Sequence, residues 1–295
     1  MVLIYESELA GHKCTTMEND NLKLWITCDI GPRLLGLSFR GGDNLLAILP
    51  DMTISFDGMD DYSPRGGHRL WSAPEVPEIT YIADDRPVEI KPEGSGLKII
   101  QEIESPTGIQ KSWKVTLQDK KARVKLIHTI SNQGDEPVEL APWAITQFRP
   151  GGTAILPLQT DLDDDHGLLP NRQIVLWPYT ELDSPWLDVN DRAITVRASM
   201  KEGALKVGAP NPAGWIAYTL DKTLFVKRAA YDREAEYLDR GASSQIYCGS
   251  DFIELETLGP VGTLSPGEFT DHQEIWEIYS EGDWPGEIKQ LYKTF

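Results

Sequence analysis

Short runs of alternating or wholly apolar residues recur along the entire chain, and they constrain its fold more than any other feature. Typical runs read LKLWITC, QKSWKVTL, RVKLIHTI and HQEIWEIY. Alternation of period two is typical of β-strands, whose successive side chains point to opposite faces. Gly-Pro, Gly-Gly and Pro-Gly turns separate more than a dozen such runs. The pattern predicts one large all-β antiparallel sandwich over residues 1–295, with a few short helices, the best candidate being 287–295.

The overall charge excludes some partners. The 28 basic and 46 acidic residues give a formal net charge of −18. Nucleic acids and anionic membranes both attract basic surfaces, so we expect neither as a partner. No apolar run of 18 residues and no basic, apolar leader is present, which predicts no membrane span and a cytoplasmic protein. Nothing in the sequence identifies a protein partner.

Motifs for cofactors are missing from the sequence. It contains no P-loop, no dinucleotide G-x-G-x-x-G and no G-x-S-x-G nucleophile elbow. Cys14, Cys28 and Cys248 are far apart and form no zinc pattern. The acidic run at 160–167 (TDLDDDHG) has the alternation of a calcium loop without its Gly and final Glu, so we expect a solvated loop. We therefore expect no cofactor and no metal.

Two carboxylates interrupt the run FIELETLGP at 252–260. On a strand, Glu254 and Glu256 share one face, while Ile253 and Leu255 share the other. The two apolar residues are expected in the core. The two acids are then expected on a polar face, where partial burial would raise the pKa of a general base.

A second unusual segment, DDYSPRGGHRLWSAPE (60–75), gathers basic and aromatic side chains around Gly66-Gly67. Adjacent glycines permit unusual backbone conformations or a close approach to a ligand. Arginine can bind hydroxyls, carboxylates or phosphates, and tryptophan stacks on sugar rings. A packed loop with internal ion pairs would read the same way. The candidate ligand-binding residues here are Arg65, Arg69, Trp71 and Glu75, with His68 between them.

Two further segments add candidates. The run APWAITQF (141–148) supplies Trp143 and Gln147, and the crowded stretch 225–249 supplies Lys227 and Asp239. A strand with one wet face, or a charged surface loop, would explain either segment without a ligand.

The C-terminal part resembles the galactose mutarotase-like superfamily, which includes aldose 1-epimerases and hexose-6-phosphate epimerase relatives. The matching elements are Leu255-Glu256-Thr257, Pro266-Gly267 and Asp271-His272. The opening strands, with Gly31-Pro32-Arg33 and Asn44-Leu45-Leu46, are similar as well. The segment GGHRLWSAPE is closer still to a bacterial branch of this superfamily with Gly-Gly-x-Arg-Leu-Trp-x-Ala-Pro-Glu.

The resemblance implies a β-supersandwich with a sugar bound on one sheet. It also implies that Glu256 takes the proton of the anomeric hydroxyl while a histidine protonates the ring oxygen. The mid-chain strand that carries this histidine in the family has Thr146 and Gln147 here. His68 is therefore the first candidate for the acid, if its loop reaches across the site, and Glu254 and Glu75 are the others.

Three functions remain open from the sequence. The first is an aldose 1-epimerase-like enzyme with Glu256 as base, and the second is a non-catalytic carbohydrate-binding protein on the same fold. The third is another sugar-processing enzyme, a lyase or hydrolase, that uses two carboxylates. All three take a small-molecule carbohydrate as ligand, and fold analogy alone does not choose among them.

Overall fold

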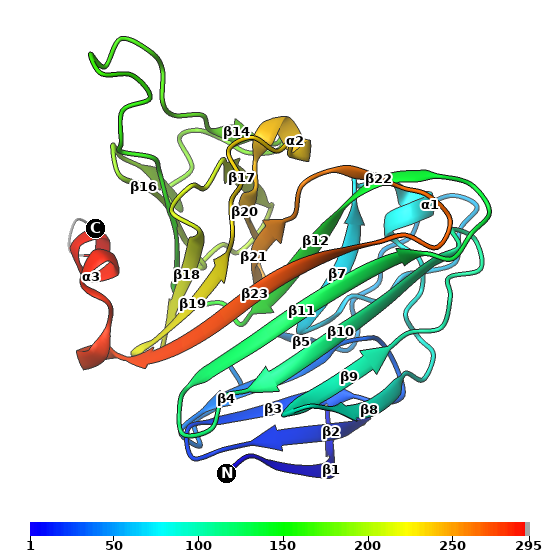
Figure 1. Cartoon of the computed structure of the whole chain (residues 1–295). Helices are drawn as coiled ribbons and strands as arrows, with labels where there is room; N and C mark the ends of the chain where they lie inside the picture. The colour runs from blue at the N-terminus through cyan, green and yellow to red at the C-terminus, as the bar shows by residue number, and fades with distance from the viewer. Residues whose placement is uncertain (293–295) are drawn as a thin grey trace.

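The computed structural model describes residues 1–292 and consists of two large antiparallel sheets packed face to face (Figure 1). The first sheet has eleven strands, with β22 (Gly262–Leu264) paired to β12. In spatial order its other strands are β1 (Leu3–Leu9), β2 (His12–Glu18), β3 (Leu22–Thr27), β4 (Leu34–Phe39), β7 (His68–Ala73), β12 (Val138–Phe148), β21 (Ile253–Leu258), β20 (Ser244–Cys248), β17 (Leu205–Ala209) and β14 (Val175–Leu176).

The second sheet has ten strands, and a two-stranded ribbon joins β5 (Ile48–Leu49) to β6 (Arg65–Gly66). In spatial order the ten are β15 (Leu187–Val189), β16 (Ala193–Arg197), β13 (Thr153–Pro157), β18 (Trp215–Leu220), β19 (Thr223–Ala229), β23 (Phe269–Ser280), β11 (Arg123–Asn132), β10 (Ile109–Leu117), β9 (Gly96–Ile100) and β8 (Glu89–Glu93). The expected all-β antiparallel sandwich is confirmed.

Helices are few and short, as expected: α1 (Pro77–Thr80), α2 (Leu238–Gly241), the 3₁₀ turn η1 (Glu281–Asp283) and α3 (Gly286–Tyr292). α3 lies on the outer face of the second sheet, where Ile288 and Leu291 pack against Trp215 and Val226. The helix expected over 287–295 thus exists as far as Tyr292, and its remainder lies outside the described residues.

The main core fills the space between the two sheets. Its members come from both, for example Leu24 and Leu255 from the first sheet and Val124 and Trp276 from the second. Ile253 and Leu255 are fully buried in it, as the alternation of 252–260 predicted.

A smaller apolar cluster lies on the other face of the first sheet. Trp71, Trp143 and Ile145 pack there with Tyr62, which lies between β5 and β6, and with Tyr81 at the end of α1. The central strands β7, β12 and β21 are therefore covered on both faces, and polar side chains on this outer face are buried too.

The glycine pair at 66–67 serves backbone packing. Both residues have positive φ, and a Cβ on Gly66 would lie 2.1 Å from the carbonyl oxygen of Ala47. A Cβ on Gly67 would lie 2.5 Å from that of Leu34. The segment RGGHRLW lies in β6 and β7, so it is not the loop that was expected to reach across the site.

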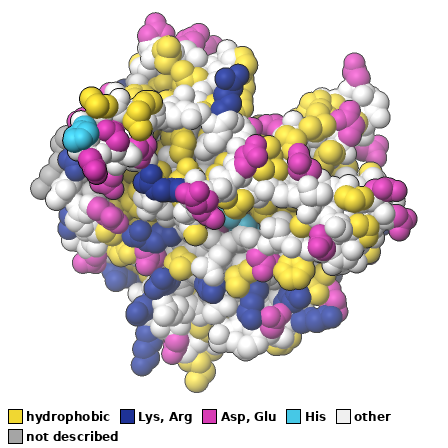
Figure 2. Space-filling view, turned by 45° about the horizontal axis from the view of Figure 1, so that its top comes forward, with side chains coloured by type: hydrophobic (Ala, Val, Ile, Leu, Met, Phe, Trp, Pro, Cys, Tyr) yellow, Lys and Arg dark blue, Asp and Glu magenta, His cyan; other side chains and the backbone are white. Residues whose placement is uncertain are grey.

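Charge is unevenly spread over the surface. In the space-filling view, Asp and Glu side chains predominate in the upper part and Lys and Arg gather in the lower half (Figure 2). No helix in residues 1–292 is both long enough and apolar enough to cross a membrane.

Candidate functional site

Strand register gathers polar and aromatic residues on the outer face of the first sheet, called here the site face. Arg69 of β7 and Glu256 of β21 both lie opposite Ile145 of β12, and Gln245 of β20 lies opposite Glu256. Side chains at paired positions of antiparallel strands share a face. The neighbouring rows are Trp71, Trp143 and Leu258 on one side, and Gln147, Glu254, Tyr247 and Lys206 on the other.

Two buried ion pairs occupy the centre of the site face. Arg69 Nη2 lies 3.1 Å from Glu254 Oε1, and Lys206 Nζ lies 2.8 Å from Glu256 Oε2. Each of the four side chains is less than a tenth exposed, and Glu256 is fully buried. Burial of four charges is costly unless they pair, and each charge here has an opposite partner.

Tryptophans surround both cations. The Arg69 guanidinium lies 4.1 Å from the Trp71 ring, within the range of a cation–π contact. Lys206 Nζ lies 4.6 Å from the ring of Trp143 and 4.7 Å from that of Trp177. Trp143 also donates its indole N–H to Glu256 Oε2 at 2.7 Å. One oxygen of Glu256 is therefore held by two donors.

Several buried polar atoms on the site face have no hydrogen-bond partner within residues 1–292. They are Glu256 Oε1, Arg69 Nε and Nη1, Gln147 Oε1 and Gln245 Oε1. A buried polar atom without a partner costs roughly 1–3 kcal/mol, so such atoms are uncommon in folded proteins. Here two donors and three acceptors of this kind lie on adjacent strands, an arrangement suited to a ligand that carries several hydroxyl groups.

The carboxyl group of Glu256 is a weaker acid than that of an ordinary glutamate. Burial raises the pKa of Glu256 to about 7, and the nearby Glu254 adds to the rise, while Lys206 and Trp143 oppose it. A carboxyl group with such a pKa exchanges a proton readily near neutrality. Glu256 Oε1 is thus the atom on the site face best suited to proton transfer.

The rim above these pairs consists of tyrosines and one acid. Tyr81 donates its hydroxyl hydrogen to Glu75 and packs against Trp71 with ring centroids 4.9 Å apart. Tyr179 and Tyr247 lie on the opposite side, with ring centroids 6.4 Å apart. Burial and the charges of Glu254 and Glu256 raise the pKa of Tyr247 to about 12.

Most of the sequence-predicted residues come together here. Glu254, Glu256, Arg69, Trp71, Trp143 and Gln147 all lie on the site face, and Glu75 lies at its rim. Asp239 contacts the site face through Gln245, whose Nε2 donates a hydrogen bond to the Asp239 carboxylate at 2.7 Å.

His68 does not join them. It precedes Arg69 on β7, so its side chain points to the opposite face of the sheet, and it is fully buried between the two sheets. Its Nδ1 lies 2.9 Å from Thr146 Oγ1 and its Nε2 lies 2.8 Å from His128 Nε2. The sequence-based hypothesis required His68 to reach across the site, and the structure shows that it does not.

Lys227 and Arg65 also lie elsewhere. Lys227 is buried between the sheets, where its Nζ lies 2.8 Å from Glu274 Oε1 and donates to the carbonyls of Ala144 and Leu255. Arg65 lies 3.4 Å from Asp84, which also pairs with the buried Arg33.

His68, His128, Lys227 and Glu274 form what we call the inter-sheet cluster. The nitrogens of His68 and His128 and an oxygen of Glu274 lie within 4.8 Å of one another, a set that could in principle hold a metal ion. Each of these atoms already has a protein partner: Trp276 Nε1 donates to Glu274 Oε2 at 2.8 Å, and His128 Nδ1 lies 3.1 Å from the carbonyl oxygen of His272. The ammonium of Lys227 further neutralises Glu274, so the cluster fits a hydrogen-bonded network better than a metal centre.

The sequence reasoning missed Lys206, Trp177, Gln245, Tyr247 and Tyr179. A lysine inside the otherwise apolar run LKVGA (205–209) was the available signal, because a buried strand rarely carries a charge without a partner. Which carboxylate would pair with it depended on the order of the strands.

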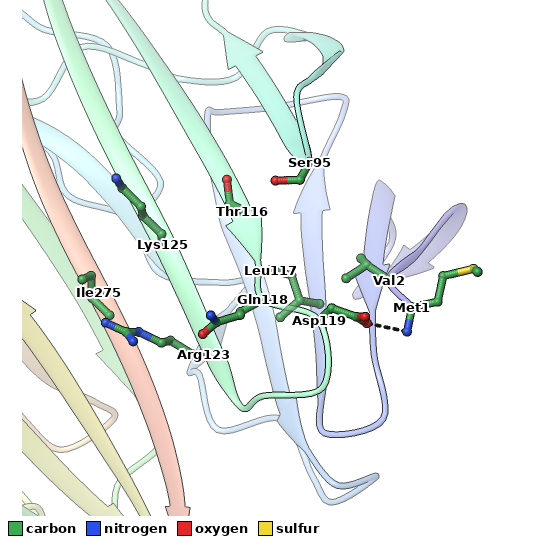
Figure 3. A pocket seen from close by; sticks show the side chains of 10 residues that line it. All are labelled: Met1, Val2, Ser95, Thr116, Leu117, Gln118, Asp119, Arg123, Lys125 and Ile275. Atoms are coloured by element: carbon green, nitrogen blue, oxygen red, sulfur yellow. Dashed lines mark ion pairs between the residues drawn. The ribbon is translucent and has the colours of Figure 1, made fainter.

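One surface hollow is lined by none of these groups. It measures about 640 Å³ and lies between the N-terminal segment and the end of β10 (Figure 3). Its lining includes Val2, Leu117 and Arg123, and the ammonium of Met1 pairs with Asp119 there. It has no convergent buried charges, so we assign the candidate site to the site face.

No family model and no curated protein matches the sequence. Solved structures are nevertheless similar in fold. A galactose mutarotase-like protein from Lactobacillus casei superposes with a TM-score of 0.58 at 12% identity, over 90% of this chain and 99% of that chain. A galactose mutarotase-like protein from Clostridium acetobutylicum gives 0.50 at 11% identity, over 95% and 99%.

A TPR-domain containing protein from Parabacteroides distasonis gives a TM-score of 0.60 at 14% identity, and 93% of this chain matches 48% of that protein. The chain thus spans about half the length of that protein. At these identities the comparisons establish the fold alone, which is the galactose mutarotase-like fold that the sequence resemblance implied.

Proposed function

We propose that the protein binds a carbohydrate on the site face and acts on it at the anomeric carbon, in the manner of an aldose 1-epimerase, with Glu256 as general base. The observation that carries the proposal is the state of Glu256. One of its oxygens is held by Trp143 and Lys206, while the other is buried without a partner, and its pKa is about 7. A base that removes a proton from an anomeric hydroxyl needs a free oxygen of this kind.

The surroundings suit a sugar in two further ways. Trp71 and Trp143 are nearly buried and pack edge to face with ring centroids 5.4 Å apart, so they hold the Arg69 and Lys206 cations in place beside the unpartnered polar atoms. The unpartnered atoms of Arg69, Gln147 and Gln245 supply both donors and acceptors for hydroxyl groups.

The experiment is anomeric exchange measured by NMR magnetisation transfer on a panel of aldoses and hexose phosphates. Wild type should accelerate exchange for at least one sugar, with a rate that rises with pH through about 7 as Glu256 loses its proton. Glu256→Gln should lower the rate about 100-fold or more while sugar affinity changes little. Glu139→Gln, at an exposed position of β12, is the matched control and should leave both unchanged.

A non-catalytic sugar-binding protein is the second candidate, and one observation favours it. Within residues 1–292, His68, His128 and His272 lie between the sheets, His12 lies against Asp29, and His166 lies in an exposed loop, so the site face carries no histidine to serve as acid. Binding without faster exchange in any sugar of the panel would select this function. New product signals in the same spectra would instead indicate a lyase or hydrolase.

A further inference from the structure

Lys206 occupies an unusual position for a lysine. It lies on β17, its side chain is 5% exposed, and its ammonium is bracketed by the rings of Trp143 and Trp177. A desolvated ammonium is costly unless charges and π faces compensate it, and the two rings and Glu256 provide this compensation. The surroundings therefore hold a charged group next to the oxygen pair of Glu256.

Most of the hydrogen-bonding capacity of this ammonium is unused. It carries three N–H donors, and one hydrogen bond is formed within residues 1–292, to Glu256 Oε2 at 2.8 Å. Glu256 Oε1 is without a partner on the same carboxylate. An acid with spare hydrogens and a base with a spare oxygen thus lie side by side.

From this geometry we propose that Lys206 is the proton donor to the ring oxygen of the sugar, the role for which the site face offers no histidine. The inference rests on the proposed function. The two oxygens on an anomeric carbon are close neighbours, so acid and base must also be adjacent, as Lys206 and Glu256 are.

The other groups of the site face are less suited to the role. Arg69 is committed to Glu254 and, as a guanidinium, does not release a proton in proteins. The pKa values of Tyr247 and Tyr179 are raised, chiefly by burial, so both are weak acids. Glu254 carries the charge that pairs with Arg69.

Ring opening of the sugar uses one proton transfer to Glu256 and one from Lys206. Glu256 Oε1 takes the proton of the anomeric hydroxyl, and a carbonyl forms between that oxygen and the anomeric carbon. The bond from the anomeric carbon to the ring oxygen breaks, its electron pair stays on the ring oxygen, and Lys206 donates a proton to it. Rotation of the aldehyde and reversal of each step closes the ring as the other anomer and restores Glu256 and Lys206.

The test compares three variants of Lys206 in the full chain, using the sugar whose exchange wild type accelerates. Lys206→Met removes the ammonium at similar length, and Lys206→Arg keeps the charge and the pairing but not the ability to give up a proton. Both should lower kcat about 100-fold or more and leave KM within about threefold. Lys206→Ala should be rescued by added alkylammonium ions, with faster rates for the more acidic ions.

Rates are compared on the alkaline plateau, because loss of Lys206 removes an interaction that lowers the pKa of Glu256. Glu254, Glu75, Arg69, Tyr179 and Tyr247 remain as the other charged or titratable groups that face this pair. The urea midpoint of each variant confirms that it is folded.

Three results overturn the inference alone: retention of the wild-type rate by Lys206→Met, its retention by Lys206→Arg, or a slow Lys206→Ala that no ammonium ion rescues. The last result would assign Lys206 to holding Glu256 in place. Failure of wild type to accelerate exchange in any sugar overturns the proposed function and this inference together.

Discussion

The two faces of the first sheet border two buried charged clusters of opposite character, and the inner cluster is shared with β11, β19 and β23 of the second sheet. On the inner face, each side-chain nitrogen and oxygen of His68, His128, Lys227 and Glu274 has a partner within the protein. On the site face, the ion pairs of Arg69 and Glu256 leave buried donors and acceptors without one. The two faces of the first sheet thus border one network that is complete and one that is open.

The difference separates stability from function. A complete buried network stabilises one arrangement of the two sheets, because breaking any member leaves an uncompensated charge. An open network lowers the stability of the free protein, because its buried polar atoms lack hydrogen-bond partners, and a ligand that supplies these hydrogen bonds restores that stability. The pKa values agree, since Lys227 and the histidines hold the pKa of Glu274 well below its usual range, while burial raises that of Glu256.

The largest expected effect comes from breaking the complete network. Glu274→Gln leaves the ammonium of Lys227 buried without a counter-charge, and we expect a loss of roughly 3–5 kcal/mol in the free energy of unfolding. Urea denaturation measures it. Glu202→Gln at an exposed position is the control and should change stability by less than about 0.5 kcal/mol. A loss below about 1 kcal/mol in Glu274→Gln would show that the inter-sheet cluster does not stabilise the fold.

Low pH should destabilise the region of the inter-sheet cluster through the neighbouring His272. Burial lowers the pKa of His272 to about 4, against 6.5 for an ordinary histidine, so the unfolded chain binds a proton that the folded chain refuses. The stability is present above pH 6.5 and is lost as pH falls toward 4, by about 3 kcal/mol for this residue.

Unfolding at several pH values tests this dependence, and a Glu256→Gln background makes it cleaner. The raised pKa of Glu256 acts in the opposite sense, because its contribution is present below its unfolded pKa and is lost as pH rises through about 7. His272→Gln should reduce the remaining slope, to which the lowered pKa values of His68 and His128 also contribute, and an unchanged slope would contradict the assignment.

A smaller effect concerns affinity on the site face. Arg69→Met removes two buried donors that we assign to a sugar, and we expect sugar affinity to fall about 10- to 100-fold. The double variant Arg69→Met/Glu254→Gln removes the unpaired acid and should regain stability without regaining affinity. Calorimetric titration separates the two quantities, and full affinity in the double variant would exclude Arg69 from the binding site.

The smallest expected effect is the change in stability caused by Glu256→Gln. Glu256→Gln makes on the open network the same change that Glu274→Gln makes on the complete one, yet we expect a smaller loss of about 1–2 kcal/mol, because the rings of Trp143 and Trp177 still compensate the ammonium of Lys206. The raised pKa of Glu256 means that the folded protein does not favour the charged form. A loss as large as that of Glu274→Gln in urea denaturation would erase the distinction between the two networks.

Much of this arrangement could be predicted from the sequence. Alternation within 252–260 placed Glu254 and Glu256 on one face and Ile253 and Leu255 on the other, because a strand has a fixed period of two. The same rule, applied to HRLWSA, separates His68 from Arg69 and Trp71. The hypothesis that made His68 the acid treated this segment as a loop, and that was the source of the error. That residues 1–295 form a single domain stays a prediction.

By itself the sequence determined the strands, the two faces of each strand and the excess of acidic residues, since these follow from the two-residue alternation along each run and from composition. Only the tertiary structure decided which strands became neighbours. β17 lies next but one to β21, with β20 between them, although about fifty residues separate Lys206 of β17 from Glu256 of β21 along the chain. That order brought Lys206 against Glu256 and enclosed Lys227 with Glu274, because partners for buried charges are set by spatial proximity and not by local sequence.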